Sequence, residues 1–209
     1  MNSQKAKKYQ IEISVIGGGI AGITTAFHLG KKGYKVNLID PKINSKINNL
    51  IPNNGSQAAM GILMGNLYKK SKGRAFSLRK KSIQLWKAWL PEIDYNKYNI
   101  KLEKPLIKLA SSEKEYQSMI EITKKKKEFG LEILDKSSIE FWNSIFQTKL
   151  IGGLISYEDG RLNPITLIKS FMESLDRIKV NKIQGTVIKI TKNINSLHKK
   201  WKIYLDKNN

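Results

Sequence analysis

The chain has 209 residues, no cysteine and a formal net charge of +21. The absence of cysteine excludes disulfides, thiol nucleophiles and thiolate metal sites, and it agrees with a cytoplasmic location, which we expect. No segment reaches the 18 or more apolar residues that a membrane-spanning helix needs. The length suffices for one domain with a substantial core, or for a core and a smaller lobe.

The positive charge comes from 34 lysines against only four arginines, and it is spread over the whole chain. Surfaces that read bases rely on arginine grouped with aromatic side chains, so this distribution does not favour nucleic acid as a partner. The densest run, Lys124–Lys127, follows a predicted helix and is typical of a solvated face.

The first motif is a predicted strand, helix and strand within residues 11–40. Apolar residues over 11–16 predict a short buried strand, and residues 20–32 predict a helix. A second apolar strand over 36–39 ends on Asp40. This order is that of a βαβ unit with an acid at the end of its second strand.

Three glycines between the first strand and the helix have the spacing G-x-G-x-x-G. Gly17 permits a tight turn, Gly19 lets the backbone approach a pyrophosphate, and Gly22 lets the helix pack closely against the strand. Phosphates then bind the free N–H groups and the positive dipole end of the helix. Asp40 is suited to accept hydrogen bonds from a ribose diol, and its charge disfavours a 2′-phosphate. The motif predicts a dinucleotide site.

Beyond residue 40 the pattern changes to a mixed α+β order. We expect an asparagine-rich loop to residue 54 and no internal repeat. The expected elements that follow are a helix over 73–90 stopped by Pro91, a strand over 105–110, a helix over 112–129 closed by Gly130, a strand over 131–134, a helix through 146 and a strand over 150–157.

Serine–glutamate pairs mark two of these helix starts. Ser112 with Glu115, and Ser137 with Glu140, have the three-residue spacing of a capping box. The pairs predict that side chains satisfy the first N–H groups of both helices.

A further helix and two strands are expected at the end of the chain. Asn163 and Pro164 have the residue types of an N-cap and a first helical position, and predict a helix to about residue 175. Alternating residues over 180–192 and 201–206 predict antiparallel strands around a turn at 193–200.

Four segments together resemble the D-amino-acid oxidase family of FAD-dependent oxidoreductases, in particular its glycine-oxidase-like members. They are the fingerprint at 11–40, the small-residue segment SQAAMGIL at 56–63, the acidic turn, proline and helix at 157–175, and the strand at 185–190. The small-residue segment resembles the one that runs past the pyrophosphate to the flavin ring.

The resemblance implies an α/β fold, a Rossmann-like FAD-binding domain with an inserted mixed α+β substrate domain. We expect residues 1–90 to form the FAD-binding βαβ region and 91–157 part of the substrate domain. Residues 158–209 would return to the FAD-binding region and the substrate lobe. The strand at 11–16 is expected at the centre of a parallel sheet, and residues 91–156 with the last two strands are expected to form a separate lobe.

The resemblance also implies FAD as the cofactor and a set of site residues. The residues expected to bind FAD are Gly17, Gly19, Ile20, Ala21, Gly22, Asp40, Ser56, Ala58, Ala59, Gly61 and Val187. Of these, Val187 matches the position whose backbone holds the adenine, and Ile62 is expected at the substrate. The family usually has Glu where this chain has Asp40, and no metal is implied.

Family members continue well beyond 209 residues, so the chain is expected to be an N-terminal portion, from a truncated gene, a fragment or a split protein. The later portion supplies the arginine and tyrosine that hold a substrate carboxylate. Catalytic residues are therefore expected beyond residue 209, and the chain alone is expected to be inert.

The implied activity is oxidation of a small amine or amino acid by hydride transfer to flavin, with O2 or another acceptor reoxidising it. Two alternatives stay open, namely the FAD domain of a tRNA-modifying oxidoreductase and a non-catalytic dinucleotide-binding remnant. The sequence also leaves open which amine is the substrate and whether the protein is a homo-oligomer.

Overall fold

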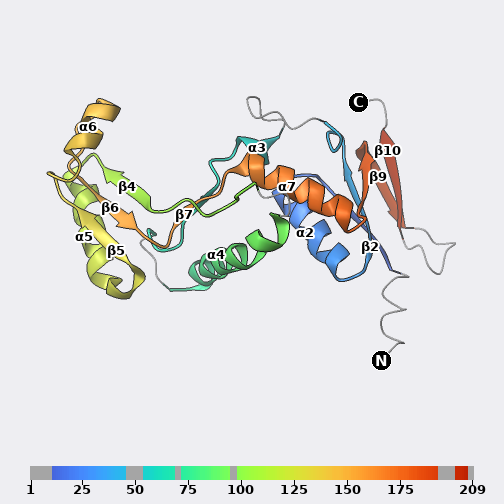
Figure 1. Cartoon of the computed structure of the whole chain (residues 1–209), viewed down its shortest axis with the longest axis horizontal. Coiled ribbons are helices and arrows are strands. Elements are labelled where there is room, and N and C mark those ends of the chain that lie inside the picture. Colours follow the sequence, from blue (N-terminus) through green and yellow to red (C-terminus); the bar gives the residue numbers. More distant parts are fainter. Residues whose placement is uncertain (1–10, 46–53, 69–71, 95–97, 193–200, 207–209) are drawn as a thin grey trace. The chain divides into compact units, whose positions relative to one another are not determined.

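The computed structural model describes residues 11–45, 54–68, 72–94, 98–192 and 201–206 (Figure 1). Its contacts divide the chain into two compact units, Met1–Ala59 with Pro164–Asn209, and Met60–Asn163. The functional division at 90/91 and 157/158 stays a prediction. The expected turn at 193–200 and most of the loop that precedes residue 54 lie outside the described residues.

A three-stranded parallel sheet forms the centre of the first unit. Its order is β1 (Glu12–Ile16), β2 (Lys35–Asp40) and β8 (Asn181–Gln184). Helix α2 (Ile20–Lys31) connects β1 to β2, as the sequence predicts. Because the three strands run in parallel, their carboxyl ends lie at one edge of the sheet.

The middle strand of this sheet is β2, so the expectation of a central β1 is wrong. β8 pairs with β2 on the side away from β1, and no strand in the described part of the chain covers the other edge of β1. Ile16 is accordingly 48% exposed, whereas Val36 and Leu38 of β2 are buried. The short apolar run alone predicts a strand but does not rank strands by burial.

The stretch expected as a single antiparallel strand over 180–192 is interrupted at Gly185. β8 runs parallel to β2, and β9 (Thr186–Lys192) pairs antiparallel with β10 (Trp201–Asp206). This β9–β10 pair belongs to the first compact unit, although it was expected in the lobe of residues 91–156. Alternation indicates a strand and does not identify its partner.

Two helices lie side by side in the first unit, α2 and α7 (Pro164–Arg177) (Figure 1). Their contact includes the buried side chains of Phe27 and Phe171, whose rings pack edge to face with their centroids 5.5 Å apart. A short helix, α3 (Gly55–Ala58), is capped by Asn54, whose side-chain oxygen accepts a hydrogen bond from Gln57 N–H at 2.9 Å. α7 begins at Pro164, as predicted.

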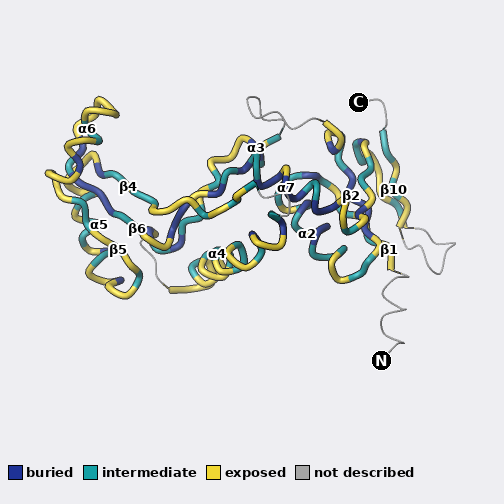
Figure 2. Tube along the Cα trace, viewed as in Figure 1, coloured by how far each residue is buried: buried dark blue, intermediate teal, exposed yellow. Residues whose placement is uncertain are grey.

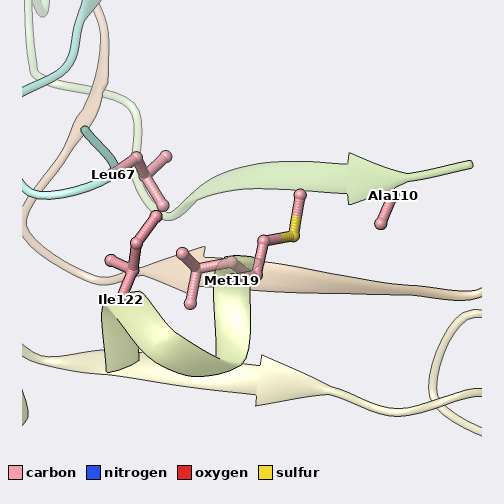
Figure 3. Close-up of a cluster of buried hydrophobic side chains, with 5 residues drawn as sticks. Leu67, Ala110, Met119 and Ile122 are labelled. Carbon is pink, nitrogen blue, oxygen red and sulfur yellow. The ribbon is translucent and has the colours of Figure 1, made fainter. Parts of the chain in front are cut away.

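The second unit contains an antiparallel sheet in the order β4 (Leu106–Ala110), β6 (Gly152–Ser156) and β5 (Leu131–Leu134). Helix α5 (Glu113–Lys125) packs on this sheet and is followed by the short 3-10 helix η1 (Lys127–Phe129). A cluster of buried side chains in this unit comprises Leu67, Ala110, Met119, Ile122 and Leu154, and Figure 3 labels the first four of them.

The second unit also contains α4 (Arg74–Ile93), α6 (Glu140–Phe146) and the strands β3 (Ile62–Leu63) and β7 (Gly160–Arg161). Figure 2 shows that α6 is mostly exposed. No helix in the described ranges is long and apolar enough to cross a membrane.

Two predicted helix ends are wrong. Helix α4 continues past Pro91 to Ile93, because a proline in the last turn removes one hydrogen bond while Asp94 N–H still donates to the Leu90 carbonyl at 3.0 Å. Helix α6 has no side-chain cap, since the Ser137 hydroxyl donates to Asp135 instead.

The other predicted cap forms in part. The Ser112 hydroxyl accepts a hydrogen bond from Glu115 N–H at 3.4 Å, as a capping box requires. The Glu115 carboxylate, however, accepts from the N–H of Ser111 at 3.0 Å. The carboxylate thus accepts from the residue before Ser112, whereas a capping box would have it accept from the N–H of Ser112 itself.

We predict that Phe171→Ala lowers the free energy of unfolding by about 3–5 kcal/mol, because it leaves a cavity between α2 and α7. Urea denaturation followed by circular dichroism measures this loss. Ile188→Ala is the control, because Ile188 is 65% exposed and its truncation should cost within about 0.5 kcal/mol. Equal effects of both changes would contradict the packing described.

Candidate dinucleotide site

The turn between β1 and α2 brings two backbone segments into direct contact. Gly17 has φ +101°, a left-handed conformation that favours glycine, and its N–H donates to the Ile39 carbonyl at 2.8 Å. A Cβ on Gly22 would overlap the Gly17 carbonyl oxygen. The first turn of α2 therefore lies directly on the glycine turn.

The N-terminus of α2 offers N–H groups beside this turn. Ile23 N–H donates to the Gly19 carbonyl at 2.9 Å, and Ile20 N–H donates to the Ser56 hydroxyl at 3.0 Å. The N–H groups of Ala21 and Gly22 lie in the first turn, where α-helical N–H groups have no intrahelical acceptor. Together with the helix dipole, they form the kind of surface that binds phosphate.

The Asp40 carboxylate is fixed beside the same turn. Its Oδ2 accepts from Gly18 N–H at 2.8 Å, and its Oδ1 accepts from Lys42 N–H at 2.8 Å. A carboxylate offers about four lone-pair directions, so acceptor capacity is left for two ribose hydroxyls. The chain holds this acid in the position that the fingerprint predicts.

A cavity of about 270 Å³ lies at this edge of the first unit. Gly18 and Asp40 form part of its wall, at the carboxyl edge of the parallel sheet, where such folds bind nucleotides. Its lining also includes the apolar side chains of Ile23, Ile168 and Met172 and the basic residues Lys42 and Lys182.

The structure brings most of the predicted FAD-binding residues into the first unit. This unit holds Gly17, Gly19, Ile20, Ala21, Gly22, Asp40, Ser56, Ala58, Ala59 and Val187. Gln184 pairs with Asp40 in the sheet, and Val187 comes three positions after Gln184. The Ser56 hydroxyl lies at the N-terminus of α2, 3.0 Å from the place of a Cβ on Gly19.

The other two predicted residues, Gly61 and Ile62, belong to the second unit. Gly61 has φ +71°, and its carbonyl accepts from Leu162 N–H at 2.9 Å. Ile62 lies in β3 opposite Arg161. The roles of all twelve residues in binding stay predictions.

Of the twelve predicted site residues, Asp40 alone is among the residues that line this cavity, and its basic residues Lys42 and Lys182 were not predicted. Lys182 lies in β8 opposite Leu38, a position that depends on β8 joining the sheet beside β2. Lys42 carried a weak signal, since it stands two positions after the acid that ends β2.

The model of the DAO family, described as FAD dependent oxidoreductase, matches residues 12–205. The chain belongs to this family. FAD is therefore its cofactor, as predicted, and the resemblance to the D-amino-acid oxidase family is confirmed.

Solved structures with the same fold include two glycine oxidases. The glycine oxidase of Bacillus cereus ATCC 14579 has a TM-score of 0.69 and 21% identity to this chain. The match covers 88% of this chain and 49% of the glycine oxidase. That of Geobacillus kaustophilus has a TM-score of 0.66 and 20% identity, covering 85% and 48%.

A third structure is the L-alpha-glycerophosphate oxidase of Mycoplasma pneumoniae with FAD bound. Its TM-score is 0.67 and its identity 14%, over 93% of this chain and 49% of that one. The chain thus spans about half the length of these structures, and at these identities they establish a shared fold. Curated protein sequences give no match.

We predict that Gly22→Ala weakens FAD binding at least tenfold and lowers the melting temperature, because the new Cβ would push α2 off the glycine turn. Titration of protein fluorescence with FAD measures the affinity. Gly55→Ala is the matched control, because a Cβ there meets nothing within 4 Å and Gly55 begins a helix. Wild-type affinity in Gly22→Ala would contradict the close approach of the two backbones.

Proposed function

We propose that the first unit binds FAD through the glycine turn, the N-terminus of α2 and Asp40. The observation that carries this proposal is the cavity lined by Gly18 and Asp40, since Gly18 belongs to the glycine turn that precedes α2 and its N–H donates to the Asp40 carboxylate. The pyrophosphate would accept from the amides of Ala21 and Gly22. The Asp40 carboxylate would hold the ribose hydroxyls.

The chemistry of the surrounding groups fits FAD. Glycines at 17–19 leave room for the backbone to approach a diphosphate, and Lys42 and Lys182 add positive charge near it. Ser56, whose hydroxyl accepts a hydrogen bond from Ile20 N–H, belongs to the small-residue segment that also contains Ala58 and Ala59. In this proposal the backbone of Val187 holds the adenine.

We infer that the protein oxidises a small amine or amino acid. FAD, when bound, accepts a hydride from the substrate carbon, and the chain's residues bind and orient the cofactor. Glycine oxidases among the similar structures support this substrate class. In this proposal Gly61 and Ile62 lie nearest to the reacting groups. The glycerophosphate oxidase shows that the same fold also occurs in an enzyme with another substrate, so the assay includes glycerol 3-phosphate.

For the cofactor proposal we predict that Asp40→Ala raises the Kd for FAD about 5- to 150-fold, since a charged hydrogen bond is worth about 1–3 kcal/mol. Gly19→Val should abolish the yellow colour of the purified protein, because its side chain would meet the Ser56 hydroxyl and the pyrophosphate path. Glu121→Gln, which changes an exposed carboxylate on α5, serves as the control. Unchanged flavin absorbance in Gly19→Val would refute the proposed site.

For the activity we predict peroxide release from glycine, sarcosine or a D-amino acid when the protein that contains this chain is supplied with excess FAD and O2. Glycerol 3-phosphate should give none. The rate is measured against free FAD and against the Gly19→Val protein. Turnover only with glycerol 3-phosphate would contradict the amine proposal while leaving the FAD site intact.

A further inference from the structure

One turn of the second unit, residues 159–162, holds a segment that lies about 95 positions earlier in the chain. We call it the acidic turn. Arg161 Nε donates to the Met60 carbonyl at 3.0 Å, and Leu162 N–H donates to the Gly61 carbonyl at 2.9 Å. The strands β3 and β7 then pair in antiparallel register. The turn thus binds the start of the segment from Met60 onward.

The carboxylate of Asp159 binds the next part of the same segment. Its Oδ1 accepts from Gly65 N–H at 2.9 Å, and its Oδ2 accepts from Asn66 N–H at 2.9 Å and from Leu67 N–H at 3.0 Å. Asp159 is fully buried. Three consecutive amides therefore converge on one carboxylate that water does not reach.

A second buried charge, the Lys126 ammonium, binds backbone carbonyls of the loop at residues 65–68. Lys126, which is 1% exposed, donates from Nζ to the carbonyls of Asn66 and Tyr68. Burial lowers the pKa of the Lys126 ammonium, and the negative charge of Asp159 raises it in part. Opposite charges thus fix the N–H groups and the carbonyls of one short loop.

The hydrogen bonds of Asp159, Arg161 and Leu162 do more than bury the two-residue strand β3, because they also fix its position. An isolated pair of two-residue strands is not stable by itself, so the register of β3 depends on the groups at its ends. The Asp159 carboxylate, with its three N–H donors, also fixes the path of the backbone at residues 65–67. A shift of this backbone would leave an amide without its hydrogen-bond partner. The acidic turn therefore determines the backbone position of residues 60–67.

We propose that Asp159 is a positioning residue for the flavin, with Arg161 assisting at Met60. The inference rests on the proposed function, because Gly61 and Ile62 are the residues expected at the flavin and the substrate. A binding site must hold its groups within about 0.5 Å of the productive geometry. The clamp on both ends of β3 supplies that accuracy, although Asp159 itself touches neither flavin nor substrate.

The test compares Asp159→Asn with Glu158→Gln in the FAD-loaded protein. The Asn amide would present N–H groups to the backbone N–H groups of the loop, so the loop should shift. We expect Asp159→Asn to bind FAD at least fivefold more weakly, with a changed visible flavin band. Glu158→Gln loses only exposed ion pairs with Lys87 and Lys104, and it should stay within twofold of wild type with the same spectrum.

A second variant covers the case in which Asp159→Asn does not fold. Arg161→Gln removes the hydrogen bond to the Met60 carbonyl from a half-exposed side chain, and it should change the flavin band in the same direction. A purely structural clamp would lower the melting temperature without altering the flavin band of the folded protein. Folded variants with wild-type spectra and affinity would overturn the proposal.

Hydrogen exchange of the protein without FAD separates failure of the clamp from failure of the FAD site. The amides of Gly65, Asn66 and Leu67 should exchange at least tenfold more slowly in wild type than in Asp159→Asn. Protected amides in a wild-type protein that binds no FAD would overturn the proposed function, and the flavin role with it. Unprotected amides in a wild-type protein that binds FAD would overturn the clamp alone.

Discussion

The site depends on one close approach, that of the Gly22 backbone to the Gly17 carbonyl. No side chain fits at position 22, and the absence of one sets α2 directly onto the end of β1. This contact aims the first-turn amides of α2 at the edge of the sheet where β2 ends. Asp40, held by Gly18 N–H, completes the same small region.

Short-range features could be predicted from the sequence because their causes lie within a few residues. The strand, turn and helix of residues 12–31 follow from apolar spacing and three glycines, and the structure has them nearly as expected. The partners of the strands could not be predicted in the same way. β8 alternates like an antiparallel strand, yet it joins β2 in parallel, because its neighbour is decided by α7 packing on α2. Local rules also failed where a competitor stood nearby, as Asp135 does for the Ser137 hydroxyl.

In the candidate site, too, features with short-range causes could be predicted, and those that depend on distant parts of the chain could not. The glycines and Asp40 were identified by their spacing, and the structure gathers them at one edge of the first unit. Lys182 was missed because its place follows from β8 pairing. The role of Asp159 was not predicted, because it depends on amides that lie 92 to 94 positions earlier. Buried charges that bind distant backbone leave no periodic trace in a sequence.

The central claim is that this chain binds FAD at the glycine turn and Asp40, and calorimetric titration of the wild-type protein tests it most directly. The account predicts saturable binding of one FAD per chain, with competition by ADP, which carries the diphosphate and the ribose diol. NADP should not compete, because the Asp40 carboxylate repels a 2′-phosphate. The absence of saturable FAD binding, or equal competition by NADP, would contradict the account.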